Sequence, residues 1–77
     1  MTTRTEVAQW MHDKVTWEKV LYQDEAVKQI EQLFGKDWVY ENDHGRRGID
    51  RRVLTTFRKL HGGSIGWDAD AKSWSLA

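Results

Sequence analysis

The feature that most restricts the fold of this chain is an amphipathic segment, IDRRVLTTFRKLH at residues 49–61, which two glycines follow at once. When its residues are placed about 100° apart around a helix, the apolar side chains share an arc of about 140°. These side chains belong to Ile49, Val53, Leu54, Phe57 and Leu60. The opposite side carries Arg51, Thr55 and Lys59, flanked by Arg52 and Arg58. The segment therefore predicts a helix over 49–61 with an apolar core face and a basic outer face, ended by the two glycines.

The tail that follows, SIGWDADAKSWSLA, predicts a C-terminal β-hairpin. Apolar residues alternate with smaller ones on both sides of DADA, which is the period of a half-buried strand. If Trp67 lies opposite Trp74, then Ile65 lies opposite Leu76, and both apolar pairs share one face. The DADA segment then forms the tip of the hairpin.

A helix and a short strand are predicted at the start of the chain. The helix opens at Thr3, because Thr3 and Glu6 have the spacing of a capping box. Its apolar stripe consists of Val7, Ala8, Met11 and Val15. The segment VLYQ at residues 20–23 is apolar and β-prone, so it predicts a short strand.

A further helix is predicted over DEAVKQIEQLF, with Asp24 as its N-cap and Gly35 just after its end. Its apolar side consists of Ala26, Val27, Ile30, Leu33 and Phe34. Residues 38–40, WVY, favour a brief extended segment. The turn-forming residues ENDHG and the GRRG that overlaps them then predict a loop leading into the helix at 49–61.

The order of helix, short strand, helix, helix and hairpin is that of an α+β, winged-helix-like domain. Seventy-seven residues allow one domain with one small core, so residues 1–77 are expected to form a single domain. The chain has no Cys, so the core must rely on aromatic bulk from five Trp, two Tyr and two Phe. No apolar run approaches the roughly 18 residues of a membrane span, and no signal-like segment opens the chain. We therefore expect a cytoplasmic protein that does not enter a membrane.

Several short motifs together resemble an uncharacterised family of short bacterial and mobile-element proteins. They are LYQDEAV, FG, VYEND, IDRRVLTTFRKL and the two hairpin tryptophans, and they span roughly residues 20–76. The resemblance implies a stand-alone winged-helix domain whose biochemical role is unknown. It brings no active site with it.

Charge is unevenly divided along the chain although the net charge is zero. Residues 1–45 carry five Lys/Arg and nine Asp/Glu, a balance of −4, and residues 46–77 carry seven and three, a balance of +4. The basic half favours contact with a polyanion, most directly the nucleic-acid backbone. In a winged-helix frame, the third helix would enter the major groove of duplex DNA. The predicted DNA-contacting residues are Arg46, Arg47, Arg51, Arg52, Thr55, Arg58 and Lys59.

Two observations oppose DNA binding and keep a second hypothesis open. Asp68 and Asp70 at the hairpin tip would repel phosphates, and the isoelectric point near 6.8 is low for a DNA-binding domain. The alternative is a protein-interaction module or a homodimer that uses exposed tryptophans and the charge split. Trp10, Trp17 and Trp38 are the candidates for such exposure.

Catalytic and metal-binding functions have little support in the sequence. His12, His44 and His61 lack the spacing of a helical metal pair, and no Cys assists them. The DADA tip lacks the loop length and further oxygen ligands of a calcium site. GRRG lacks the spacing and the lysine of a phosphate-binding loop. We therefore expect no enzyme, no metal and no cofactor.

Overall fold

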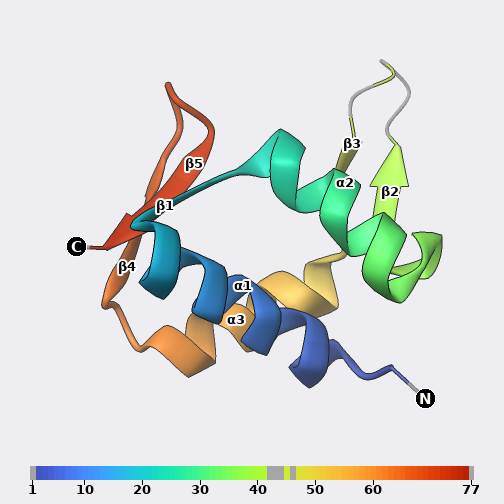
Figure 1. The fold of residues 1–77 in the computed structure, drawn as a ribbon, viewed down its shortest axis with the longest axis horizontal. Coiled ribbons are helices and arrows are strands. Elements are labelled where there is room, and N and C mark those ends of the chain that lie inside the picture. The colour runs from blue at the N-terminus through green and yellow to red at the C-terminus, as the bar shows by residue number, and fades with distance from the viewer. Residues whose placement is uncertain (1, 42–44, 46, 77) are drawn as a thin grey trace.

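The computed structural model describes residues 2–41, 45 and 47–76 (Figure 1). Its elements are α1 (Arg4–Glu18), β1 (Val20–Tyr22), α2 (Gln23–Phe34), the 3-10 turn η1 (Lys36–Trp38), β2 (Val39–Glu41), β3 (Arg47–Ile49), α3 (Arg51–His61), β4 (Ile65–Asp68) and β5 (Ser73–Leu76). Over these residues the chain is a small α+β domain with three helices and a C-terminal antiparallel strand pair. This architecture is compatible with the winged-helix-like fold class predicted from the sequence.

The C-terminal hairpin has the predicted register. Trp67 lies opposite Trp74 and Ile65 opposite Leu76. Strand β1 joins the other edge of β5 through Leu21, which pairs with Trp74, so the strand order in this sheet is β1-β5-β4. Ile65 and Trp74 are buried, whereas Trp67 and Leu76 remain about half exposed.

The turn of this hairpin is tied to helix α2. The Asp68 carboxylate accepts hydrogen bonds from the backbone N–H groups of Asp70 and Ala71, at 3.0 and 3.1 Å. Lys72 adopts a left-handed conformation at φ 52°, which closes the turn. Its carbonyl accepts a hydrogen bond from the Gln23 N–H at 2.9 Å. An N–H at the first turn of α2, which has no partner within the helix, is satisfied in this way.

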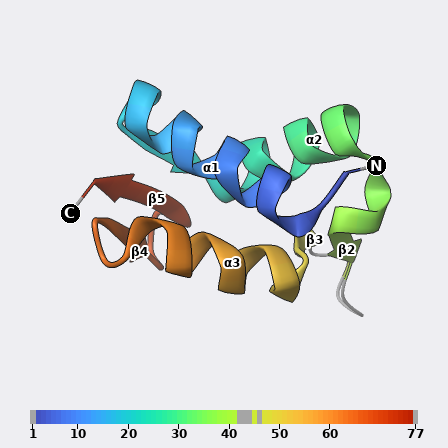
Figure 2. The same ribbon diagram turned by 90° about the horizontal axis from the view of Figure 1, so that it is seen from below.

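The core lies between α1 and α3, which run side by side (Figure 2), and extends to the sheet and α2. Helix α1 contributes the stripe predicted from its sequence, and α3 contributes Val53 and Phe57. The Phe57 ring meets the Trp74 ring edge-to-face, with centroids 5.9 Å apart. At the other end, Trp10 meets Phe34 at 6.3 Å in the same manner. Aromatic bulk thus joins the three helices to the sheet in a core that has no disulfide.

Several predicted helix ends are confirmed. Thr3 caps α1, and its hydroxyl accepts a hydrogen bond from the Glu6 N–H at 3.2 Å. Gly35 and Gly62 occupy the C-cap positions of α2 and α3, and Gly62 is left-handed. These are positions where a residue without a Cβ costs least.

The start of α2 differs from the prediction. The strand predicted over 20–23 ends at Tyr22, and the helix begins at Gln23 rather than after an Asp24 cap. Tyr22 holds the N-cap position without a side-chain hydrogen bond, and Asp24 lies in the first turn. The hydrogen bond from Gln23 to the C-terminal hairpin favours this earlier start, because it gives the first N–H of the helix a partner.

The segment before α3 also differs from the prediction. Residues 47–49 form a strand that pairs with β2, so Ile49 belongs to a second hairpin rather than to the helix. Ile49 is nonetheless buried, because its strand delivers it to the core. Asp50 occupies the N-cap position of α3, which begins at Arg51 rather than at residue 49. The predicted loop residues 42–44 and 46 lie outside the described residues.

Two leucines predicted for the core are on the surface. Leu33 is 61% exposed and Leu60 is 39% exposed. Leu33 lies two turns after Ala26 on the same side of α2, so its exposure marks where packing on that side ends. Leu60 lies in the last turn of α3, beyond the buried Phe57.

Candidate nucleic-acid interface

The outer face of α3 is fixed by what the helix buries on its other side. Val53 and Phe57 are almost fully buried, and they set the rotation of the helix about its axis. Arg51, Thr55, Arg58 and Lys59 are all exposed as a result. Successive members at four-residue spacing lie about 6 Å apart along the axis. The predicted basic face of this helix therefore exists as a continuous exposed stripe.

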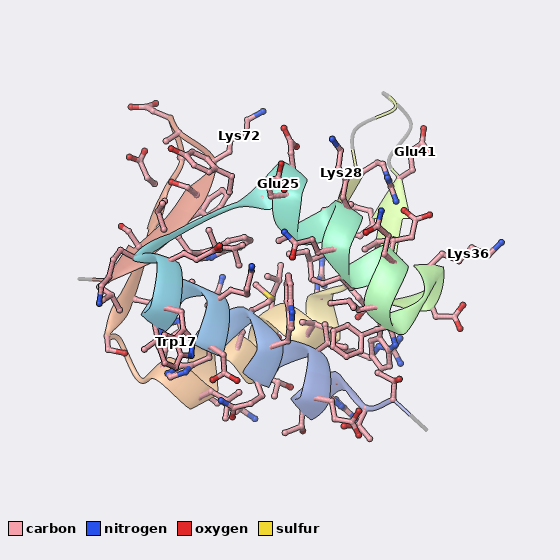
Figure 3. All side chains as sticks on the ribbon, in the orientation of Figure 1. Trp17, Glu25, Lys28, Lys36, Glu41 and Lys72 are labelled. Atoms are coloured by element: carbon pink, nitrogen blue, oxygen red, sulfur yellow. The ribbon has the colours of Figure 1, made fainter. Side chains whose placement is uncertain are left out.

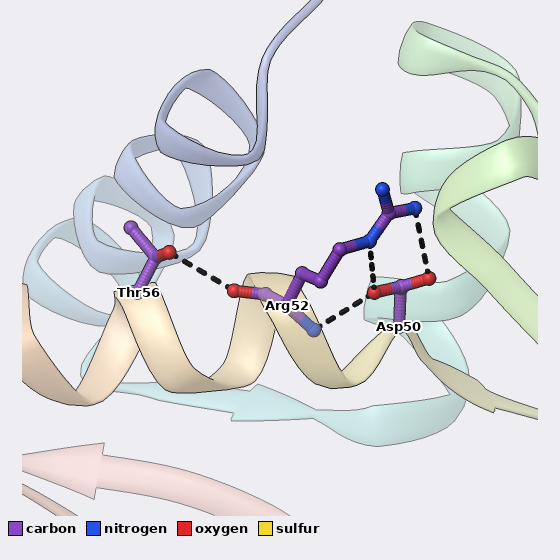
Figure 4. Close-up of polar contacts among 3 residues, drawn as sticks. All are labelled: Asp50, Arg52 and Thr56. Carbon is purple, nitrogen blue, oxygen red and sulfur yellow. Dashed lines mark hydrogen bonds and ion pairs between the residues drawn. The ribbon is translucent and has the colours of Figure 1, made fainter.

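Asp50 holds the start of this helix through two kinds of hydrogen bond (Figure 4). Its carboxylate accepts from the Arg52 backbone N–H at 2.8 Å, which is the capping bond. It also accepts from Nε and Nη2 of the Arg52 guanidinium, at 3.0 and 3.2 Å. The hydrogen bond from Arg52 holds the pKa of Asp50 below its usual value, and the same pair raises the pKa of Arg52.

Arg52 is consequently engaged within the protein. Besides its pairing with Asp50, its guanidinium carbon lies 5.2 Å from the centre of the Trp38 ring, which is cation–π distance. The Arg52 side chain thus links the start of α3 to the η1 turn. Among the predicted DNA-contacting residues, Arg52 has a structural role that Arg51 and Lys59 do not share.

Arg47, on strand β3 of the second hairpin, is also paired within the protein. Its guanidinium forms an ion pair with Glu31 on α2. Its carbonyl also accepts a hydrogen bond from the Gln23 side chain at 3.4 Å. Arg47 therefore fastens β3 to α2. Arg46, its predicted companion, lies outside the described residues.

The acidic hairpin tip lies away from the basic helix. Figure 1 shows the turn between β4 and β5 at the opposite end of the hairpin from α3. The Asp68 carboxylate faces into its own turn, where it accepts the two backbone hydrogen bonds described above. That separation would weaken any repulsion between this tip and an anion bound at α3.

The histidines form no metal centre within the described residues, where no group of three or more His, Cys, Asp or Glu side chains converges. His61 packs edge-to-face on Phe57, with ring centroids 4.9 Å apart. Its Nδ1 accepts a hydrogen bond from the Gly63 N–H at 3.0 Å, and burial lowers the pKa of the ring. His44 lies outside the described residues.

No helix in the described part of the chain is long and apolar enough to cross a membrane. Of the tryptophans that sequence alone left unplaced, Trp10 and Trp38 pack against the core. Trp17 is 82% exposed on α1. Figure 3 labels it near the C-terminal end of that helix.

The fold and the surface define a small α+β domain whose most distinctive surface is an exposed basic helix. The chain belongs to the family described as "Family of unknown function (DUF6953)", whose model matches residues 3–76. Neither the curated proteins nor the solved structures contain a match to it. The match agrees with the prediction of an uncharacterised family and covers helix α1 as well as the later elements.

Sequence reasoning missed the partners that hold the arginines. Asp50 directly precedes the basic helix, and this position is a recognisable N-cap signal. The N-cap role of Asp50 could therefore have been predicted from the sequence around it. The pairing of Glu31 with Arg47 and the stacking of Arg52 on Trp38 have no comparable signal, because each joins different elements.

Proposed function

We propose that this domain binds duplex DNA through the exposed face of α3. The observation that carries the proposal is the rotation of the helix, which buries Val53 and Phe57 and exposes Arg51, Arg58 and Lys59. Arginine and lysine on such a face bind phosphates, and they hydrogen-bond guanine edges in the major groove. Thr55, between Arg51 and Lys59 on the same stripe, adds a hydroxyl that can contact either.

The dimensions of the helix suit this role. Its diameter of about 10–12 Å matches a major groove about 12 Å wide. From Arg51 to Lys59 the stripe rises about 12 Å, which corresponds to three or four base pairs at about 3.4 Å each. A single domain of this kind would therefore read a short site.

The basic residues have different roles in the proposed contact with DNA. Arg51 and Lys59 are the central contacts, with Arg58 directed to a flanking phosphate. Arg47 and Arg52 position the neighbouring elements through Glu31, Asp50 and Trp38. The connection from α2 to α3 contains η1 and the β2–β3 hairpin, whereas a helix-turn-helix uses a turn of three or four residues. We therefore base the proposal on α3 alone and include no contact from α2.

The test is a fluorescence-anisotropy titration of a labelled duplex at low salt. The double variant Arg51→Glu with Lys59→Glu should abolish the binding seen for the wild type. A matched control, Lys19→Glu with Lys36→Glu, makes the same change in net charge at exposed positions on other elements. The control should retain most of the affinity. Equal losses in both double variants would show that only overall charge matters, and a wild type that fails to bind would refute the proposal.

A second candidate function is protein interaction or self-association, and the exposure of Trp17 favours it. Tryptophan is enriched among the residues that dominate binding at protein interfaces. The Trp17 side chain is 82% exposed and is therefore accessible to a partner. If α1 forms a homodimer through this residue, light scattering after size exclusion should give twice the monomer mass. Trp17→Ala should then return the protein to the monomer. A wild type that stays monomeric at high concentration excludes the homodimer.

A further inference from the structure

Figure 1 shows the two β-hairpins on either side of the start of α2. The residues that line a groove here come from both hairpins and from α2. Within the described residues it consists of three adjoining hollows of about 590, 350 and 680 Å³. Tyr40 lines all three hollows. Trp67 lines the first two, and Leu54 and Arg58 line the last two. The shared residues place the hollows next to one another, and we treat them together as one groove.

Tyr40 lies at the centre of this groove with its ring against Gly48. It lies opposite Gly48 in the second hairpin, and its ring covers that glycine. A Cβ added at Gly48 would lie 2.7 Å from the Tyr40 hydroxyl oxygen, so only glycine permits this position of the ring. The Tyr40 side chain nonetheless remains 54% exposed. One side of the ring thus packs on the backbone while the rest is available to a ligand.

Trp67 offers a second ring in the same way. Its ring packs on that of Trp74, with centroids 4.6 Å apart and the planes tilted by 49°. Trp74 is in turn fixed against Phe57 in the core. Trp67 is still 46% exposed and lines the groove. The groove therefore carries two aromatic rings, one from each hairpin, and each ring packs on a neighbouring residue of its own hairpin.

Cationic side chains lie at both ends of the groove. Lys28 and Lys72 line one end, and Figure 3 shows them projecting from α2 and from the C-terminal hairpin at the same edge of the molecule. Arg51 and Arg58 line the other end. Among the residues that the structure describes, the lining acids are Asp24 and Asp50, and Asp50 is already paired with Arg52. The balance of charge favours an anion, and the exposed rings favour a planar group.

We infer that this groove binds single-stranded nucleic acid. Bases stack on Tyr40 and Trp67, and the phosphates that connect them are neutralised by the lysines and arginines at the two ends. Stacking on aromatic rings combined with a cationic track is the general mode by which proteins hold single strands. An acidic peptide would satisfy the cations but would not use the flat faces of the rings. The inference goes beyond duplex binding by α3 and does not depend on it, although Arg51 and Arg58 belong to both surfaces.

The test compares a labelled oligothymidine of about 12 nucleotides with a duplex of similar length, both by fluorescence anisotropy. Tyr40→Ala and Trp67→Ala should each weaken single-strand binding by about 5-fold to 150-fold. Tyr40→Phe and Trp67→Phe keep an aromatic ring and should bind nearly as well as the wild type. Tyr22→Ala, which removes a 51% exposed aromatic ring outside the residues that line the groove, is the matched control and should have no effect. Thermal unfolding of each variant confirms that the fold persists.

The outcomes separate this inference from the proposed duplex binding. Loss of single-strand binding in the two alanine variants, with duplex binding unchanged, supports a separate site in the groove. A wild type that binds duplex but not the oligothymidine overturns the inference and leaves the proposed function intact. If the wild type binds the oligothymidine but no duplex, and Lys59→Glu still binds the oligothymidine, the groove is supported and the proposed function is refuted. Competition by poly-glutamate as strong as that by oligothymidine would also overturn the inference, because it would show a site for acidic proteins.

Discussion

Replacing Asp50 by alanine tests whether the start of α3 is held as described. The substitution removes the acceptor for the Arg52 N–H, which caps the helix at 2.8 Å. Loss of an N-cap side chain costs about 0.5–2 kcal/mol of the free energy of unfolding. In a domain of this size each kcal/mol corresponds to about 4–8 °C in the midpoint of thermal unfolding. We therefore expect Asp50→Ala to lower the midpoint by several degrees.

Asp50→Asn separates the cap from the ion pair. Asparagine accepts the same backbone hydrogen bond but carries no charge to pair with the Arg52 guanidinium. Its midpoint should therefore lie much closer to that of the wild type than to that of Asp50→Ala. Unfolding followed by circular dichroism, thermally and in urea, measures all three proteins. Asp70→Ala is the control, since Asp70 is exposed in the β4–β5 turn and such changes usually cost less than about 0.5 kcal/mol. If Asp50→Ala and Asp70→Ala are equally stable, the capping argument is wrong.

The same residue predicts a pH dependence. The hydrogen bond from Arg52 holds the folded-state pKa of Asp50 below its unfolded value of 3.8. The stabilisation is therefore complete above that pH, and it is lost as the pH falls through the lower, folded-state pKa. Below about pH 4, the wild type should lose stability faster than Asp50→Asn, which has no carboxylate at this position. Parallel curves for the two proteins would contradict the assignment.

Three further predictions concern the core, the helix ends and the histidine. Phe57→Ala should cost about 3–5 kcal/mol in urea unfolding, because the ring is almost fully buried and supports Trp74, and a loss below about 1 kcal/mol would contradict the core. Lys19→Gly should stabilise the protein by about 1 kcal/mol, because Lys19 caps α1 at φ 73°, and an unchanged or lower midpoint would contradict this. Burial lowers the pKa of His61 below its ordinary value of 6.5, so the stability it contributes is complete above that pH and is lost as the pH falls through the folded-state pKa. Urea unfolding at neutral and mildly acidic pH should therefore show a larger loss for the wild type than for His61→Gln, and equal losses would exclude His61 as the cause.

The features that the sequence predicts well are those specified over a few residues. The Thr3 cap, the glycines that end α2 and α3, and the pairing of Trp67 with Trp74 each follow from a short pattern with a direct physical cause. The same is true of the buried stripe on α1, because helical spacing alone places those side chains together. These elements suffice to define the fold class.

The second hairpin could not be predicted with the same rules. Its strands have three residues each, and their pairing joins Val39 to Ile49 across a segment rich in turn formers. Ile49 also fits the helical period of the segment that follows it, so an apolar pattern alone cannot distinguish a last strand residue from a first helix residue. Asp50 decides the matter, because an N-cap marks the boundary between them.

The charge pattern predicted the exposed stripe on α3 but not how its arginines are used. A count of basic residues treats Arg47, Arg51 and Arg52 alike. The fold distinguishes them. Arg47 pairs with Glu31, and Arg52 contacts Asp50 and Trp38. Arg51 lies exposed on the outer face of α3. Part of the split between an acidic and a basic half is therefore neutralised across elements, which no local rule detects.

The salt dependence of duplex binding tests the central claim most directly. If Arg51, Arg58 and Lys59 neutralise three phosphates, the logarithm of the association constant should fall with the logarithm of salt concentration at a slope of about −2.7. Between about 50 and 200 mM salt, that slope weakens binding by about 40-fold. Lys59→Ala should reduce the magnitude of the slope by about 0.9, whereas Lys36→Ala should leave it unchanged. A slope that does not respond to Lys59→Ala, or a wild type that binds no duplex at the lowest salt, would contradict the claim that α3 contacts DNA.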